Sequence, residues 1–267
     1  MIKVESRGDG PGAPVVALHS GGMSGRQWRK LADRLDASHR VVMPDFLGSG
    51  DNPPWPKDAP FDFHADIAEV AEILATLPAP FHLVGHSYGG LIAVTLARKS
   101  PESVRSLSVF DPVAFGVLYD PPDEVGLSDL ERSARNEVFF DDARGGGPEW
   151  FEAFVDYWNG PGAWKAMPAP AQAGFLKVGR KVYGEVRSLL GDRTPASAYA
   201  SIRAPALLLT GERSPPAAGR VVARLASALP SSTVLTVSGA GHMGPLTHGA
   251  QINDAIASHI ARAESTS

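Results

Sequence analysis

The sequence contains no cysteine among its 267 residues. This absence excludes disulfide bonds, thiolate catalysis and cysteine-ligated metal sites. No apolar run approaches the roughly 18 residues of a membrane-spanning helix, and lysine and arginine nowhere cluster into a basic arm. The formal net charge of −4 gives no reason to expect nucleic acid or an anionic membrane as a partner.

The first ten residues, MIKVESRGDG, lack the apolar core of a secretory signal peptide. We therefore expect a cytoplasmic protein that acts on a small molecule, and the sequence leaves its oligomeric state unknown. Hydrophobic residues make up 43% of the chain, which is enough to build a complete core.

Apolar runs typical of buried strands alternate with segments of helical spacing. This alternation predicts an α/β fold, in which a mainly parallel, doubly wound sheet is covered by helices on both faces. The expected strands span residues 2–6, 14–18, 40–44, 81–85, 104–110, 205–210 and 233–237.

The pattern changes between residues 115 and 200, where strand-like runs stop and aromatic residues and prolines cluster. We expect helices over 128–139, 148–158 and 170–190. An all-helical insertion at this point would lie over the carboxyl ends of the strands, where ligands bind in such sheets. The predicted domains are a core of residues 1–114 and 201–267 and a helical cap of residues 115–200. Trp158 and Trp164 are candidates for lining the substrate pocket.

The most informative motif is Gly85-His86-Ser87-Tyr88-Gly89, which lies between a strand-like run and a helix-forming run. A strand that turns directly into a helix strains the middle residue and exposes its side chain at the edge of the sheet. Serine is a weak nucleophile unless a base accepts its proton and a third group orients that base. Ser87 is therefore the candidate nucleophile.

Five segments in order now resemble the α/β-hydrolase superfamily over nearly the whole chain: HSGG at 19–22, DFLGSG at 45–50, GHSYGG at 85–90, LLLTGE at 207–212 and GAGHMGP at 239–245. The resemblance implies the α/β-hydrolase fold, with Ser87 as nucleophile and His242 as general base. It also implies an oxyanion hole formed by the backbone N–H groups of Gly21 and Tyr88.

The acid of the expected triad departs from the family pattern. Relatives usually carry an aspartate three residues after the glycine of LLLTGE, but Ser214 occupies that position. Asp111, directly after the strand 104–110, lies where certain dehalogenases and lipases carry their acid, and Glu212 is the alternative. We prefer Asp111 because the base needs an orienting carboxylate on the cleft side.

These residues together predict a serine hydrolase that needs no cofactor and no metal. Its substrate would be a small molecule with a carbonyl group, namely an ester or a lactone, cleaved through an acyl-enzyme. The same triad also serves hydrolases of C–C bonds, thioesters and amides and perhydrolases, and the fold also supports non-catalytic small-molecule receptors. These functions are the alternatives.

Overall fold

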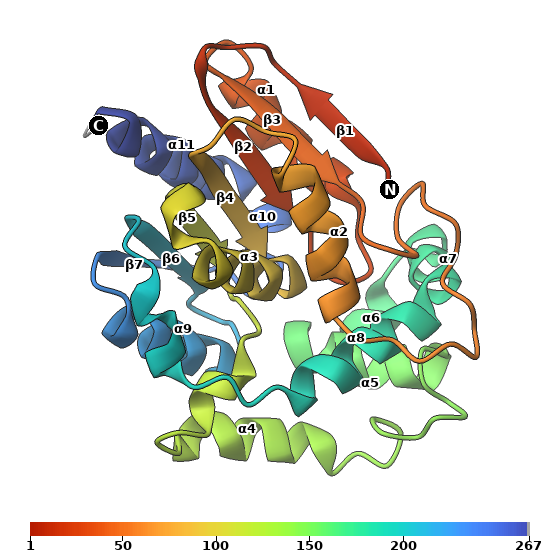
Figure 1. Cartoon of the computed structure of the whole chain (residues 1–267). Helices are drawn as coiled ribbons and strands as arrows, with labels where there is room; N and C mark the ends of the chain where they lie inside the picture. The colour runs from red at the N-terminus through yellow and green to blue at the C-terminus, as the bar shows by residue number, and fades with distance from the viewer. Residues whose placement is uncertain (266–267) are drawn as a thin grey trace.

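The computed structural model describes residues 1–265, and a seven-stranded sheet forms their centre (Figure 1). The strand order is β1-β3-β2-β4-β5-β6-β7, and every neighbouring pair is parallel except β1 with β3. The predicted α/β fold and its seven strands are confirmed. The strands are β1 (Val4–Arg7), β2 (Gly12–Leu18), β3 (His39–Pro44), β4 (Phe81–His86), β5 (Val104–Phe110), β6 (Ala206–Gly211) and β7 (Ser232–Val237).

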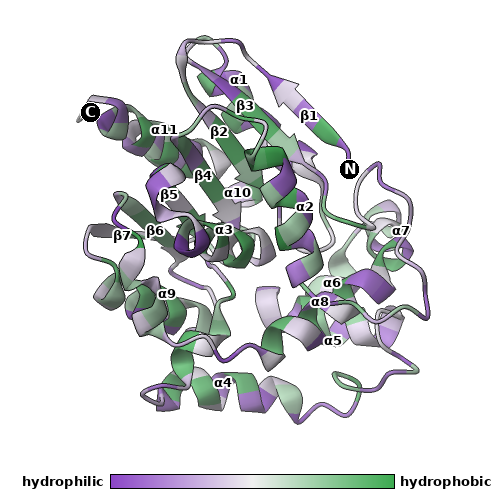
Figure 2. Ribbon diagram, viewed as in Figure 1, coloured by the Kyte–Doolittle hydropathy of each residue, from purple (hydrophilic) through white to green (hydrophobic). Residues whose placement is uncertain are grey.

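Helices cover both faces of this sheet (Figure 1). Successive residues of a strand point to opposite faces. Val16 and Leu18 therefore belong to the apolar cluster that also contains residues of α2, α3 and α9, whereas Val15 and Ala17 belong to the cluster that contains residues of α1 and α11. Figure 2 shows the resulting apolar strands at the centre of the ribbon. These helices are α1 (Arg29–Leu35), α2 (His64–Leu74), α3 (Tyr88–Lys99), α9 (Pro216–Ala228) and α11 (Gly249–Ser265); the short helices η1 (Gly25–Trp28), η2 (Pro101–Ser103) and α10 (Gly244–Thr247) complete the core.

The chain between β5 and β6 forms helices but no strand. This helical insertion has an aromatic centre of its own, in which the rings of Trp150 and Phe154 stack with their centroids 4.9 Å apart. It lies beyond one end of the sheet (Figure 1). Its elements are η3 (Phe115–Leu118), α4 (Glu124–Ala134), α5 (Pro148–Asn159), α6 (Ala163–Ala166), α7 (Ala169–Lys177), α8 (Gly179–Gly191) and η4 (Ala196–Ser201).

Two helices of the insertion differ from their predicted bounds. The single helix expected over 170–190 is divided into α7 and α8 at Val178. A Cβ at Gly179 would collide with the carbonyl oxygen of Gly146, so this segment approaches another part of the backbone closely. α4 begins four residues earlier than expected, because the carboxylate of Asp123 accepts a hydrogen bond from the N–H of Gly126 (3.0 Å) and caps the helix.

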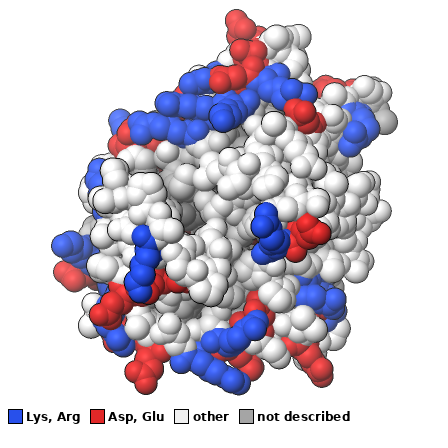
Figure 3. All heavy atoms as spheres, turned by 180° about the vertical axis from the view of Figure 1, so that it is seen from behind, with Lys and Arg blue, Asp and Glu red and all other residues white. Residues whose placement is uncertain are grey.

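No helix within residues 1–265 combines the length and the apolar character needed to cross a membrane. Acidic and basic side chains are interspersed on the face shown in Figure 3, mostly around its margins and some nearer its centre.

Candidate active site

Ser87 lies at the sharp turn between β4 and α3. Its φ of 54° and ψ of −117° are strained for a residue with a side chain. The strand and the helix approach each other closely at this turn. A Cβ at Gly85 would collide with the backbone of Gly89. A Cβ at Gly89 would in turn collide with the carbonyl oxygen of Leu18. The two glycines of the motif therefore permit the turn that presents Ser87.

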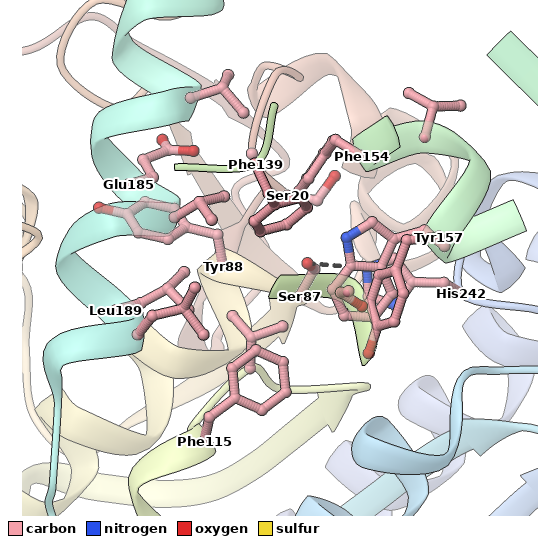
Figure 4. Close-up of a pocket in the computed structure, with 18 of the residues that line it drawn as sticks. Ser20, Ser87, Tyr88, Phe115, Phe139, Phe154, Tyr157, Glu185, Leu189 and His242 are labelled. Carbon is pink, nitrogen blue, oxygen red and sulfur yellow. Dashed lines mark hydrogen bonds between the residues drawn. The ribbon is translucent and has the colours of Figure 1, made fainter. Parts of the chain in front are cut away.

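His242 lies between Ser87 and Asp111. Its Nε2 is 2.9 Å from the Oγ of Ser87, a contact drawn as a dashed line in Figure 4. Its Nδ1 is 3.1 Å from Oδ2 of Asp111. The loop that carries His242 follows β7 and is fixed by His86, whose Nε2 donates to the carbonyl oxygen of His242 (2.8 Å). Burial lowers the pKa of His86 well below its usual value, so this second histidine is a neutral donor.

Asp111 is fully buried at the end of β5, with a φ of 42°. Its Oδ1 accepts a hydrogen bond from the hydroxyl of Thr210 (2.6 Å), and its Oδ2 accepts one from the hydroxyl of Ser214 (2.6 Å). These contacts and His242 hold the carboxylate in one orientation. Ser214, which stands where relatives carry their acid, therefore supports the carboxylate that faces the histidine.

Glu212 points elsewhere. Its Oε2 accepts hydrogen bonds from the hydroxyl of Ser238 (3.0 Å) and the N–H of Gly239 (2.7 Å) at the surface. Within residues 1–265, no hydrogen bond joins Glu212 to His242. The geometry therefore brings Asp111, and not the alternative acid, to the candidate base.

Gly21 and Tyr88 border the same cavity as Ser87. Tyr88 is the first residue of α3, and the first N–H groups of a helix have no partner within it. The loop containing Gly21 is anchored by His19, whose Nδ1 donates to the carbonyl oxygen of Ser20 (2.7 Å) and whose Nε2 accepts from the N–H of Phe46 (3.1 Å). Burial lowers the pKa of His19 to about 4, which keeps it in this neutral form.

The cavity above Ser87 has a volume of about 980 Å³ and is lined mainly by apolar side chains of the helical insertion. Trp158 is one of them, and its ring stacks on His242 with centroids 3.7 Å apart and planes at 21°. Trp164 is placed differently from the expectation. It packs against Phe151 at 5.4 Å in the aromatic centre of the insertion and does not border the cavity in the described chain.

Sequence reasoning missed a buried group of charged side chains beside the cavity. Lys181 and Glu185 of α8 form an ion pair one helical turn apart, and Lys181 also binds Asp66 of α2 at 2.8 Å. The i, i+4 spacing of a lysine and a glutamate is ordinary on exposed helices. Nothing in the local sequence indicates that this pair is buried.

One other group has the residue types of a metal site. The ligand atoms of His39, His82 and Glu264 lie within 4.8 Å of one another near the start of β3 and β4. However, Oε1 of Glu264 already contacts Nε2 of His82 (2.9 Å), the N–H of Ala13 (3.2 Å) and Nε of Arg105 (3.2 Å). The guanidinium occupies the place of a cation, so the arrangement is an ion-pair cluster.

The chain is similar to known proteins over nearly its whole length. A sequence model described as the alpha/beta hydrolase family matches residues 15–255. The chain is 32% identical to a pimeloyl-[acyl-carrier protein] methyl ester esterase of Chromobacterium violaceum, and the match covers 96% of this chain and 97% of that protein.

Two further matches are more limited in length or in identity. The pimeloyl-[acyl-carrier protein] methyl ester esterase of Aeromonas salmonicida is 36% identical over 115 residues, which are 40% of this chain and 39% of that protein. Among solved structures, a thermophilic esterase from Thermogutta terrifontis superimposes with a TM-score of 0.72 at 20% identity, over 98% of this chain and 94% of that one. At this identity the likeness concerns the fold.

Proposed function

The chain belongs to the alpha/beta hydrolase family and is a hydrolase, and from this premise we propose that it cleaves small-molecule esters or lactones through an acyl-enzyme on Ser87. One observation carries the proposal: the unbroken hydrogen-bonded series Ser87–His242–Asp111 at the floor of a cavity. The esterase relatives support the ester as substrate class.

In the proposed first step, Oγ of Ser87 attacks the substrate carbonyl carbon while Nε2 of His242 accepts the hydroxyl proton. Negative charge develops on the carbonyl oxygen, which the N–H groups of Gly21 and Tyr88 would stabilise. Asp111 accepts a hydrogen bond from the Nδ1–H of His242 and stabilises the imidazolium that forms. The tetrahedral intermediate then collapses, and His242 returns the proton to the departing alcohol.

In the second step, His242 takes a proton from a water molecule, and the resulting hydroxide adds to the acyl carbonyl. Collapse of this second intermediate releases the acid and restores the Ser87 hydroxyl. A non-catalytic receptor would have no need for a buried carboxylate oriented by two hydroxyls toward a histidine. The geometry therefore favours catalysis over the receptor alternative.

The test is labelling with a fluorophosphonate, followed by intact mass measurement and assays with esters of increasing acyl length. We expect one adduct on the wild type and none on Ser87→Ala, and a loss of kcat of at least about 10³-fold in that variant. Ser227→Ala, on the exposed surface of α9, is the matched control and should label normally. Failure of the wild type to label, or labelling that persists in Ser87→Ala, would refute the proposal.

A further inference from the structure

The cavity above Ser87 contains one buried acid in an otherwise mainly apolar lining. Glu131, Arg187 and Arg193 border the cavity but are exposed, whereas Glu185 is only 2% exposed. Figure 4 shows its carboxyl group beside Tyr88, on the α8 side of the site. A charged group is rarely buried without a partner, so the surroundings of Glu185 need an explanation.

One of the two carboxyl oxygens of Glu185 is held firmly. Oε1 binds the ammonium of Lys181, which also binds Oδ2 of Asp66 at 2.8 Å. Asp66 in turn accepts hydrogen bonds from the hydroxyl of Tyr88 (2.7 Å) and the N–H of Leu47 (2.8 Å). Lys181 and Asp66 are thus occupied by partners within the protein, and the network fixes the orientation of Glu185.

The other oxygen, Oε2, has no hydrogen-bond partner within the described residues. It lies beside Gly21, because a Cβ placed on that glycine would be 2.6 Å from it. The absence of a side chain at position 21 therefore makes room for the carboxylate. Gly21 is also one of the two residues proposed to bind the carbonyl oxygen, so Oε2 faces the part of the cavity next to the scissile carbonyl.

We propose that Oε2 of Glu185 is a binding subsite for a hydrogen-bond-donating substituent, a hydroxyl or an ammonium group, on the acyl chain close to the scissile carbonyl. The enzyme would then prefer hydroxyacyl or aminoacyl esters to unsubstituted ones. This inference rests on the proposed ester hydrolysis and specifies its substrate class.

The physical reason is the cost of burying a polar substituent. A hydroxyl that leaves water for an apolar cavity loses its hydrogen bonds unless the protein supplies a partner. Conversely, an unsubstituted chain leaves Oε2 without water and without a partner, and sites built for a polar group reject analogues that lack it. Burial raises the pKa of Glu185 to about 7. A hydroxyl can bind either form of the carboxyl group, whereas an ammonium group pairs with the ionised form.

The test compares kcat/KM for ethyl butanoate with that for its 2-hydroxy, 3-hydroxy and 3-amino derivatives. We expect the wild type to prefer at least one substituted ester by about tenfold or more. Glu185→Leu should reduce that ratio to about one. Glu185→Gln retains an amide that can bind a hydroxyl, so it should keep a preference for hydroxyacyl esters and lose a preference for the amino ester.

Glu152→Gln is the matched control, since it also removes an acid from an ion pair of the insertion but lies away from the cavity lining. Its substrate ratio should equal that of the wild type. A role of Glu185 in folding alone would lower both rates together and leave the ratio unchanged in Glu185→Leu, which would overturn the proposal. A wild-type ratio near one would do the same. Labelling of Ser87 by the fluorophosphonate keeps this failure separate from a failure of the proposed hydrolysis.

Discussion

At the residue scale, Asp111 differs from the usual family pattern in the strand that carries the acid. The acid comes from the end of β5, while the place after β6 is taken by Ser214, whose hydroxyl is 2.6 Å from Oδ2. The side chains of residues 111 and 214 therefore meet beside His242. It follows that a carboxylate at either position, but not at both, suits the proposed base, because two adjacent carboxylates would repel each other.

Asp111→Asn should reduce kcat by about 10⁴-fold, since the amide cannot stabilise the imidazolium and favours the wrong tautomer. Adding Ser214→Asp to this variant should recover part of the loss. Ser214→Asp alone should lower activity, because it removes the hydroxyl that donates to Oδ2 of Asp111 and puts a second carboxyl group in its place. Steady-state kinetics with an ester of the labelling study and the rate of fluorophosphonate labelling measure these effects. Full activity of Asp111→Asn would show that Asp111 is not the acid.

The sequence predicted Ser87, His242 and Gly21 by position, but it left two acids open. Local sequence does not reveal which carboxylate turns toward the histidine, because that direction depends on a left-handed backbone at Asp111 and on hydroxyls from β6 and the loop after it. Local sequence likewise does not reveal which of Trp158 and Trp164 faces the site. They lie six residues apart, and only the packing of the insertion determines which one faces the site.

At the scale of elements, two helices of the insertion contact the site in different ways. α5 supplies Trp158, which covers one face of His242. α8 supplies Lys181, whose ammonium joins the insertion to Asp66 of α2. The contact of Trp158 concerns the proposed base, whereas the ion pair of Lys181 with Asp66 attaches the insertion to the core.

Trp158→Ala should lower kcat about tenfold, because a ring stacked on an imidazolium contributes about 1–2 kcal/mol when water is excluded. Trp158→Phe should keep most of the activity. The measurement is kcat with a short ester, which does not depend on the remote parts of the cavity. Trp164→Phe, in the aromatic centre of the insertion, is the control and should change stability but not kcat. Equal kcat values for the wild type and Trp158→Ala would contradict this expectation.

Lys181→Met should lower the free energy of unfolding by about 3–5 kcal/mol, because it leaves the buried carboxylates of Asp66 and Glu185 without their cation. Lys165→Met removes the ammonium of an exposed pair with Glu152 and should leave the free energy of unfolding nearly unchanged. Urea unfolding of the three proteins measures both values. Similar effects of the two substitutions would show that the buried network contributes little to the attachment of the insertion.

At the scale of the whole molecule, the strands were predictable because buried parallel strands read as continuous apolar runs. The division of α7 from α8 was not, since it depends on a backbone contact with Gly146, more than thirty residues earlier in the chain. The far end of the sheet also holds features that periodicity does not reveal. His82 is fully buried there, against Ser106 and Glu264.

Burial lowers the pKa of His82 to about 4 from an ordinary value of 6.5. The unfolded chain therefore binds this proton at a higher pH than the folded one, and the fold loses stability as the pH falls from about 6.5 to 4. The loss attributable to His82 is about 3 kcal/mol. His39, Arg105 and Glu264 face the same ring.

Urea unfolding at pH 7 and pH 4 of the wild type and His82→Gln tests this expectation. The wild type should lose about 3 kcal/mol more than the variant, because the other titrating groups, Glu185 included, are common to both proteins. Parallel pH profiles would mean that His82 takes up its proton without disturbing the fold.

The stacking of Trp158 on His242 has a further, optical consequence. A protonated imidazole in contact with an indole quenches its fluorescence, because the excited ring gives up an electron to the cation. The emission of Trp158, obtained as the difference between the wild type and Trp158→Phe, should therefore fall when His242 is protonated. The protein thus carries, in the ring stacked on its proposed base, an intrinsic fluorescent indicator of that base's charge.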